Sequence, residues 1–273
     1  MKTFIISWLS SLLFLVSLSG CNKDEAKSTL CRPTSVAFYF AGQSTGDSAA
    51  YRYDSQNRLI QMDEYSGGPS YFLWFSTEVT YNTAGQPDTV RRKRFIPDGT
   101  EFESMRETYV MTYTSKAKPF TSVVLDGVDM SPSYTLTFTH DDAGHFIKKQ
   151  VLTNQGALYE YAYSYNEQGN LLSYTYKDDN GTIWNGRENH EFDSHPLFFQ
   201  GSIALSLIDV YLADYYQPGT NNATSSTVYK IGSTHYNGFP VTFTFTYNAE
   251  GWPLRVTSSD SRFNESRLRY TCP

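Results

Sequence analysis

A short motif recurs along the chain at intervals close to multiples of about 27 residues. It consists of an aromatic residue, Asp or Asn, two variable residues, Gly, one further residue and then an apolar one. The clear copies are Tyr53-Asp54 to Leu59 with Asn57 in the Gly position, Tyr81-Asn82 to Pro87 with Gly85, His140-Asp141 to Phe146 with Gly144, Tyr165-Asn166 to Leu171 with Gly169, and Tyr247-Asn248 to Leu254 with Gly251. Such a repeat restricts the fold to architectures that use one small unit many times.

Each copy has the residues that a hairpin turn requires. The Asp or Asn side chain hydrogen-bonds the backbone two residues further on and starts the turn. The Gly, or Asn57 in the first copy, accepts the positive φ that the reversal needs. We therefore expect every copy to form the tip of a β-hairpin.

The residues that lead into the turns alternate between two classes. Tyr134, Leu136 and Phe138 fall on one face of an extended strand, and the threonines between them fall on the other face. Residues 159–165 have Tyr at every second position, and 241–247 repeat the pattern with Val241 followed by Phe, Phe and Tyr. The alternation predicts an antiparallel sheet with one packed face and one face in water.

The repeat length predicts the number of strands. A unit of about 27 residues holds two strands of about ten residues with their turns. Degenerate copies at Tyr113–Phe120 and Phe192–Leu197 occupy two of the gaps, and another unit is expected near 216–219. We predict an all-β, antiparallel, up-and-down sheet of about 16 strands that curls or closes like a barrel. A circular barrel of that size has an interior wider than side chains fill, so we expect it to be flattened, open or plugged.

One segment departs from the alternation. Between Ser202 and Tyr216 the apolar residues recur at helical spacing, and Pro218-Gly219 follow. We predict one short amphipathic helix at 202–216 that covers the apolar face or the open end of the sheet. A polar loop from Asn221 to Thr227 is expected after it.

The motif resembles the YD repeats of Rhs-type and teneurin-like proteins. The whole arrangement resembles a Bacteroides family of outer-membrane lipoproteins with a domain of unknown function that is described as porin-like. The likeness covers most of the chain after the leader, with departures at His140 in place of Tyr, Asn57 in place of Gly, and prolines at Pro87 and Pro253. The resemblance implies a porin-like β fold and brings no known activity.

The N-terminus has the features of an export signal. Lys2 precedes an apolar run from Phe4 to Leu18, which is short for a membrane span and typical of a signal peptide. The sequence Leu18-Ser19-Gly20-Cys21 resembles the bacterial lipobox, which implies that Cys21 is acylated and begins the mature chain; an ordinary secretory peptide is the alternative. We therefore divide the chain into a signal peptide (1–20), an acylated N-terminus and tether (21–33) and a hairpin-repeat domain (34–273).

The residues after Cys21 indicate on which side of the outer membrane the protein is displayed. Asn22-Lys23-Asp24-Glu25 resembles the surface-export signal of Bacteroidetes lipoproteins, and a solvated tether on the periplasmic side is the alternative. The chain has a net charge of −6, so anionic lipid headgroups do not attract it and the acyl chains must hold it at the outer membrane. A membrane-spanning barrel is disfavoured, because a lipid anchor would be redundant and the apolar face is rich in Tyr.

Two further cysteines, Cys31 and Cys272, lie near the two ends of the mature chain. A disulfide between them would persist outside the cytoplasm and would require the first and last strands to be neighbours. Two unpaired thiols are the alternative.

The sequence contains no phosphate-binding loop, dinucleotide fingerprint or HExxH helix, so we predict no cofactor. His190 and His195 are five residues apart and would face opposite sides of a strand, and Asp178-Asp179-Asn180-Gly181 has the sequence of a turn, so no metal site is predicted. We interpret the basic run Arg91–Arg94 as an exposed strand whose charges discourage edge pairing. This interpretation is favoured over a nucleic-acid site.

Aromatic side chains are the remaining candidates for a site. Trp74, Trp184 and Trp252 lie near turns, where exposed rings stack on sugars, although most aromatic residues in a period-two pattern belong to the core. We expect a non-enzymatic binding or structural module, with a glycan or a surface protein as its partner and no affinity for nucleic acid. The alternative is a surface enzyme that processes glycans, which needs two carboxylates about 5 to 10 Å apart in a cleft.

Overall fold

The protein folds into a closed antiparallel β-barrel, as the sequence predicts. The structure is a computed structural model that describes residues 31–40, 46–67, 71–113, 119–127, 129–197, 219–232, 235–260 and 263–272. The strands are β1 (Arg32–Phe40), β2 (Asp47–Tyr53), β3 (Leu59–Ser66), β4 (Phe72–Tyr81), β5 (Pro87–Arg94), β6 (Glu107–Tyr113), β7 (Pro119–Asp126), β8 (Ser131–His140), β9 (Phe146–Thr153), β10 (Leu158–Tyr165), β11 (Leu171–Lys177), β12 (Ile183–Pro196), β13 (Asn221–Gly232), β14 (His235–Tyr247), β15 (Pro253–Ser258) and β16 (Phe263–Thr271). A single 3₁₀ turn, η1 (Glu103–Met105), is the one helical element in the described ranges.

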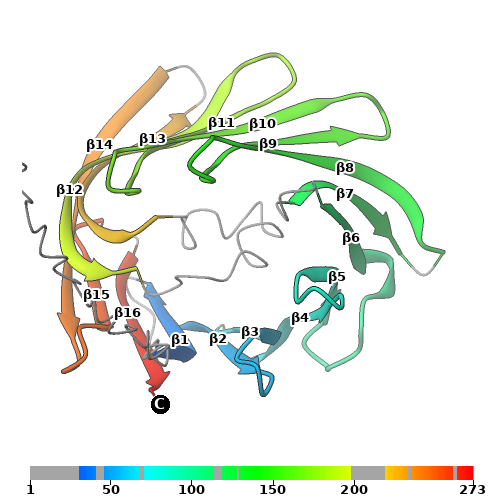
Figure 1. Cartoon of the computed structure of the whole chain (residues 1–273), viewed down its shortest axis with the longest axis horizontal. Coiled ribbons are helices and arrows are strands. Elements are labelled where there is room, and N and C mark those ends of the chain that lie inside the picture. The colour runs from blue at the N-terminus through cyan, green and yellow to red at the C-terminus, as the bar shows by residue number, and fades with distance from the viewer. Residues whose placement is uncertain are drawn as a thin grey trace, which may run out of the picture.

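Each strand pairs with its neighbours in the chain, and β16 returns to pair with β1. Figure 1 shows this closure, with the blue β1 beside the red β16. Because successive hairpins of an up-and-down barrel alternate between its two ends, all clear copies of the motif lie at the same end. We call this the repeat end, and we call the opposite end, which carries the β3–β4, β5–β6 and β7–β8 connections, the distal end.

The first copy of the motif illustrates the turn. The Asp54 backbone N–H donates to the Arg58 carbonyl and the Asn57 N–H donates to the Asp54 carbonyl, both at 2.9 Å. Oδ1 of Asp54 accepts the N–H groups of Gln56 and Arg58, and Asn57 has a φ of 69°. The fifth residues of the other copies, Gly85, Gly144, Gly169 and Gly251, also have positive φ. This is a turn that ends in a left-handed residue and a β-bulge, and the strand register shifts at the first motif residue in each copy.

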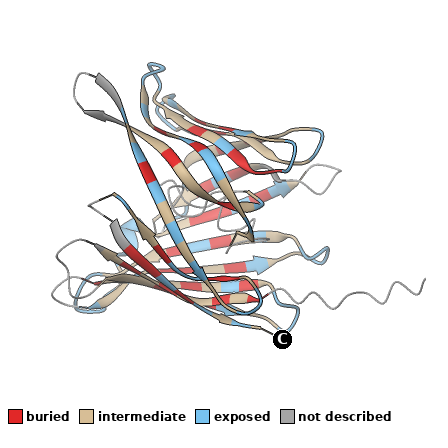
Figure 2. Ribbon diagram, turned by 90° about the vertical axis from the view of Figure 1, so that its left-hand side faces the viewer, coloured by how far each residue is buried: buried red, intermediate tan, exposed pale blue. Residues whose placement is uncertain are grey.

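Alternation along the strands separates an interior face from an outer face. In β8, Leu136 and Phe138 are buried and belong to one cluster with Tyr109, Tyr161 and other inward side chains. A second cluster of the same kind spans β1, β2, β3, β15 and β16. Figure 2 shows the resulting bands of buried residues along the strands. The aromatic residues of the repeat therefore pack in the interior.

The outer face carries ion pairs between neighbouring strands. Arg52 contacts Asp63 at 3.2 Å across β2 and β3, and Lys93 contacts Glu78 at 3.2 Å across β4 and β5. Further pairs on this face are Lys148 with Glu160 and Arg255 with Glu265. The outer face is thus charged and rich in Thr around much of the ring.

Three local predictions were wrong. The expected loop 221–227 is part of β13, because the polar Ser226 points inward and its hydroxyl donates to Oδ1 of Asn189 at 2.7 Å. The degenerate motif 192–197 lies almost wholly in β12, where its register against β13 is irregular. The basic run Arg91–Arg94 is in β5, which is not an edge because it pairs with both β4 and β6. Arg92 is buried.

Two predicted segments lie outside the described residues: the leader and acylated cysteine in 1–30, and the helix at 202–216. Strand β1 begins at Arg32, before the predicted domain boundary at residue 34. No helix in the described ranges has the length and apolarity that a bilayer crossing needs.

A disulfide joins the two ends of the barrel domain. It links Cys31, just before β1, to Cys272, just after β16, and their Cα atoms are 4.2 Å apart. Both cysteines lie at the repeat end, because β1 starts there and β16 finishes there. The first and last strands are therefore linked covalently as well as by their backbone hydrogen bonds.

Candidate functional site

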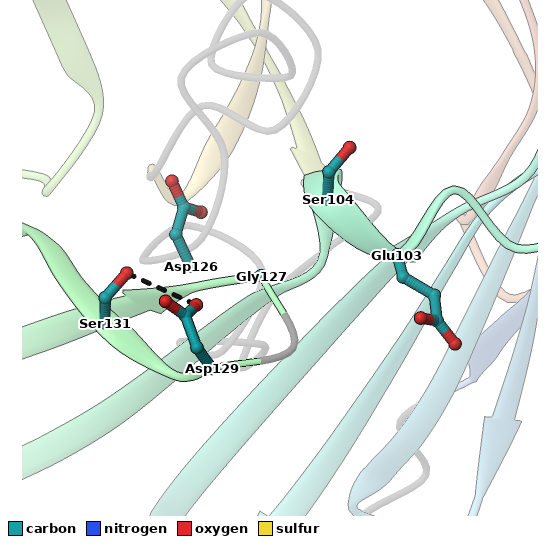
Figure 3. A pocket seen from close by; sticks show the side chains of 6 residues that line it. All are labelled: Glu103, Ser104, Asp126, Gly127, Asp129 and Ser131. Atoms are coloured by element: carbon teal, nitrogen blue, oxygen red, sulfur yellow. Dashed lines mark hydrogen bonds between the residues drawn. The ribbon is translucent and has the colours of Figure 1, made fainter.

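An open pocket of about 550 Å³ lies at the distal end. Glu103 and Ser104 of η1 line one side of it (Figure 3). The other side is lined by Asp126 at the end of β7, Gly127 and Asp129 of the connection, and Ser131 at the start of β8. The Ser131 hydroxyl lies 3.5 Å from Oδ1 of Asp129. The pocket presents three carboxylates and two hydroxyls to solvent.

A polar cluster on the interior face adjoins this pocket through Asp126. Glu107 is the direct cross-strand partner of both Asp126 on β7 and Arg92 on β5. Its two carboxylate oxygens accept the hydroxyls of Tyr109 at 2.9 Å and Tyr134 at 3.0 Å. Two carboxylates, Glu107 and Asp126, are therefore cross-strand neighbours, and Asp126 also lines the pocket.

The tyrosines of this cluster remain hydrogen-bond donors. Burial raises the pKa of Tyr109 well above its ordinary value, and the neighbouring Tyr134 and Glu107 raise it further. Burial, followed by the negative charge of Glu107, also raises the pKa of Tyr134. Both hydroxyls are thus protonated at neutral pH and hold Glu107 as an acceptor.

Arg92 closes the cluster on the β3 side. Its guanidinium lies 4.0 Å from the centre of the Phe75 ring and 3.3 Å from a carboxylate oxygen of Glu64. A buried Arg needs such partners, since an uncompensated charge in the interior is costly. The interior near the distal end is therefore polar and charged, while the interior nearer the repeat end is aromatic and aliphatic.

Three aromatic rings, two of them exposed, gather at the distal end on β3, β4 and their connection. The rings of Tyr65 and Tyr71 are stacked with centroids 5.3 Å apart and planes 3° apart, and Tyr71 is 59% exposed. Trp74 is 38% exposed and packs against Phe75. We call Tyr65, Tyr71 and Trp74 the aromatic strip. Its Trp74 carbonyl accepts the Phe95 N–H, which joins it to the connection that carries η1.

Hydrogen-bonding groups lie next to the aromatic strip. On the outer face of β3, Asp63 accepts bonds from Arg52, Gln61 and Ser76. The Tyr71 hydroxyl is 2.8 Å from the hydroxyl of Ser48 on β2. Flat rings beside carboxylate, amide and hydroxyl groups are chemically suited to sugars, which offer apolar ring faces and many hydroxyls.

The structure separates the three predicted tryptophans. Trp184 is also at the distal end and is 50% exposed, but it is on β12, on another part of the ring from β4, and its indole N–H donates to Asp178 at 2.7 Å. Trp252 is at the repeat end and only 6% exposed, so its proposed role in stacking on a glycan is wrong. The reason is its position in the motif, where its ring packs against Tyr270 at 6.0 Å.

Potential metal ligands converge at one place in the described part of the chain. Cys31, Glu250 and Cys272 have ligand atoms within 4.8 Å of one another, but the two sulfurs are bonded to each other and do not offer thiolates. The predicted turn Asp178–Gly181 is a turn, with the Oδ1 atom of Asp178 accepting the N–H groups of Asn180 and Thr182. The Cys31–Cys272 bond and the turn hydrogen bonds of Asp178 thus explain both groups of residues without a metal ion.

Comparison with solved structures concerns the whole barrel. The barrel is similar to a porin-like protein from Bacteroides uniformis ATCC 8492. The match has a TM-score of 0.54 at 14% identity and covers 88% of this chain and 96% of the other. A porin-like protein from Bacteroides vulgatus ATCC 8482 matches with a TM-score of 0.40 at 10% identity, covering 88% and 99%, which is too low a score to support an argument. No protein-family model matches the chain, and no curated protein does. At this identity the first likeness establishes a shared fold.

Sequence reasoning missed most of the site. Tyr71 stands in a short connection outside any repeat, so no pattern marks it. Glu107 occupies an inward position by the same alternation that places Tyr109 inside. Extending the alternation from Tyr109 by two residues predicts that Glu107 also points inward. It does not predict that Glu107 lies next to Asp126.

Proposed function

We propose that this protein is an acylated lipoprotein of the outer membrane that holds its barrel outside the bilayer and binds glycans, without enzymatic activity, at the aromatic strip. The observation that carries the proposal is the exposed ring of Tyr71, stacked on the half-buried Tyr65, together with the exposed Trp74. Large exposed aromatic groups are uncommon on soluble surfaces and mark binding sites. The adjacent Asp63, Gln61 and Arg52 supply the polar groups that orient a sugar.

The position of the chain's start supports an outward orientation of the strip. Cys21 precedes Cys31 by a tether that reaches at most about 35 Å when fully extended. Cys31 is at the repeat end, so an acyl anchor on Cys21 places the repeat end toward the membrane. The distal end and its aromatic strip then face away from it.

The polarity of the two faces favours a barrel that stands in water. Bilayer-spanning barrels have an apolar outer band about 25 Å tall and a polar interior. Here the outer face has the ion pairs Arg52–Asp63 and Lys93–Glu78, and aromatic and aliphatic side chains fill much of the interior face. Membrane attachment would then depend on the acyl chains, of which two or more give stable anchoring.

Intact mass of the membrane-extracted protein tests the anchor. The expected result is a chain that begins at Cys21 and carries acyl groups, and a Cys21→Ser variant that is released into the soluble fraction. Protease treatment of whole cells then distinguishes the two sides of the outer membrane. An unmodified wild-type protein in the soluble fraction would contradict the anchor.

A glycan array tests the binding site. We expect wild type to bind a subset of glycans, and Tyr71→Ala and Trp74→Ala to lower affinity at least about tenfold, since stacking by one ring contributes about 1 to 3 kcal/mol to related contacts. Trp184→Ala is the matched control, because it removes an exposed tryptophan at the same end but on a different strand. Equal binding by all four proteins would place any glycan site elsewhere.

A glycan-processing enzyme is the alternative that one observation favours. Glu107 and Asp126 are cross-strand partners on one face, a placement that puts their Cβ atoms about 4.5 to 5.5 Å apart. Retaining glycosidases hold their two carboxylates at a similar separation. Glycan turnover by wild type that is lost in Glu107→Gln, with binding retained, would establish this activity in place of simple binding.

A further inference from the structure

The junction between β16 and β1 has the geometry of a repeat unit. In the intact units the first motif residue is the Cα partner of the seventh, as in Tyr81 with Pro87 and Tyr165 with Leu171, and the register shifts beside that pair. Tyr270 of β16 pairs with Pro33 of β1 in the same way, and the register shifts between Pro33 and Ser35. The pairing therefore assigns Tyr270 to the first position of a motif and Pro33 to its seventh.

Side-chain contacts make the same assignment. In an intact unit, the tyrosine that starts the next motif donates its hydroxyl to the carbonyl of the seventh residue and packs its ring against the sixth. Tyr81 does this with Leu59 and Arg58, at 2.7 Å to the carbonyl oxygen and 4.4 Å from the ring centre to the guanidinium. The Tyr165 hydroxyl likewise donates to the Phe146 carbonyl at 2.8 Å, and its ring centre lies 4.8 Å from that of His145.

Tyr53 makes the same two contacts with the first residues of β1. Its hydroxyl donates to the Pro33 carbonyl at 2.9 Å, and the Arg32 guanidinium lies 5.7 Å from its ring centre. Arg32 and Pro33 thus behave as the sixth and seventh residues of a motif whose first residue, Tyr270, comes from the other end of the barrel domain. On the other side, Trp252 is a sixth residue and packs against Tyr270 at 6.0 Å.

The disulfide lies where the missing turn would be. Between Tyr270 and Arg32 the intact motif has four residues, and here that space holds Thr271 and Cys272 from one chain end and Cys31 from the other. The Glu250 carboxylate, from the turn of the adjacent unit, lies within 4.8 Å of both sulfurs. The bond therefore occupies a place in the ring of turns at the repeat end.

We propose that the Cys31–Cys272 disulfide serves as the turn of an eighth hairpin unit, so that the barrel is a circular array of eight units closed by a bond between its chain ends. Seven units are connected through the chain, and the eighth is connected through sulfur. Covalent closure of the ring then depends on an oxidising compartment, where such bonds persist.

A circular permutant tests the proposal. In this permutant a four-residue linker, Asn-Ala-Glu-Gly, connects Tyr270 to Arg32 and copies the turn Asn248–Gly251. Both cysteines and the N-terminal tether are removed. The new chain ends are made after the exposed Gln155. The comparison proteins are the wild type and the Cys31→Ser/Cys272→Ser variant. A permutant that carries Val in place of the Gly of the new turn is the matched control.

We expect the double Ser variant to lose about 10 °C of melting temperature and to exchange the amide protons of β1 and β16 faster than wild type. The permutant should recover the wild-type values of both, and the Val control should not. A folded permutant with the stability and the exchange pattern of the double Ser variant would overturn the proposal.

A second measurement applies if the permutant does not fold. A protease site is placed in the turn at Gln155 of the otherwise native chain, and the purified protein is cut there. If the disulfide acts as a turn, the cut and oxidised protein stays folded as one particle. Dithiothreitol, which reduces the bond to two thiols and leaves as a cyclic disulfide, should then speed exchange in β1 and β16 first. Exchange that rises equally in all strands would contradict the assignment.

Discussion

The Tyr81 hydroxyl donates a 2.7 Å hydrogen bond to the carbonyl oxygen of Leu59, the last residue of the preceding motif. Tyr113 makes the same bond to Pro87, and Tyr165 makes it to Phe146. The ladder to the next hairpin begins two residues further along the strand, at Gln61, Thr89 and Lys148, so the phenol donates to the carbonyl where a ladder partner would otherwise do so. In these three units Tyr suits the first motif position better than Phe, because its ring fills the interior edge while its hydroxyl joins two consecutive hairpins.

Removing that hydroxyl should weaken the barrel without changing its packing. We expect Tyr81→Phe to lower the free energy of unfolding by about 1 to 3 kcal/mol, because the carbonyl of Leu59 loses its donor in a partly buried site. Urea denaturation measures the change. Tyr39→Phe is the control, since the Tyr39 ring keeps its contact with Arg267 in either form. Equal stability of the two variants would contradict a role for the hydroxyl.

Glycines of similar conformation should differ in their tolerance of a side chain. Gly169 and Gly181 have φ values of 78° and 77°, so alanine is strained at both, by about 1 to 2 kcal/mol. A Cβ at Gly169 would also lie 2.8 Å from Oγ1 of Thr220 and 3.3 Å from Nε2 of His145, whereas nothing lies within 4 Å at Gly181. Gly169→Ala should therefore have the lower melting temperature. Calorimetry of the two variants measures the difference, which would be absent if crowding at Gly169 were irrelevant.

The parts of the fold that sequence predicts are those set by local chemistry. An Asp or Asn followed by a left-handed residue fixes the turns, and alternation of Tyr with Thr fixes the faces. Strand β13 was not predicted because its inward residues Asn222 and Ser226 are polar, and the Asn222 amide nitrogen and the Ser226 hydroxyl donate to partners on β12 where apolar packing would be usual. That satisfaction depends on residues far away in the chain and leaves no periodic signal.

The sequence alone did not predict which residues of the candidate site lie together. Burial of Trp252 follows from its contact with Tyr270 across the last hairpin, which no local pattern reveals. The pairing of Tyr65 with Tyr71 depends on the course of the β3–β4 connection. Proximity of Glu107 to Asp126 depends on the exact register of β6 against β7. Each of these requires tertiary geometry.

The two faces of β8 predict opposite responses to truncation. Phe138 is 2% exposed and belongs to the larger interior cluster, so Phe138→Ala should cost about 3 to 5 kcal/mol of stability. Thr137 is its neighbour on the outer face, and Thr137→Ala should change stability by no more than about 0.5 kcal/mol. Equilibrium unfolding in urea measures both. A large loss at Thr137 would mean that its face is covered.

Alkaline pH should unfold the barrel through its motif tyrosines. Burial raises the pKa of Tyr81 and of Tyr113 to about 12, from an ordinary value of 10.0. Their protonated forms are favoured in the folded state, so stability is complete below pH 10 and falls as the pH rises toward 12. Absorbance of tyrosinate followed together with circular dichroism should show ionisation and loss of structure in the same range. Tyrosines that ionise near pH 10 without unfolding would contradict this.

Acid should act through the turn carboxylates, and Asp54 offers the clearest test. Partial burial raises the pKa of Asp54, but the hydrogen bonds and charge of Arg58 outweigh that effect and lower it overall from 3.8. A lowered pKa of Asp54 in the folded state contributes stability at pH values above the unfolded-state pKa, and this contribution is lost as the pH falls through the folded-state pKa.

The variant Asp54→Asn isolates the charge. Its amide oxygen still accepts the turn N–H groups, as Asn82 does in the next copy, but the negative charge is absent. We expect wild type to be more stable than Asp54→Asn at pH 7, and the difference to shrink below about pH 4. Urea unfolding at pH 7, 5, 3 and 2 measures the difference, and a value independent of pH would exclude Arg58 as its cause.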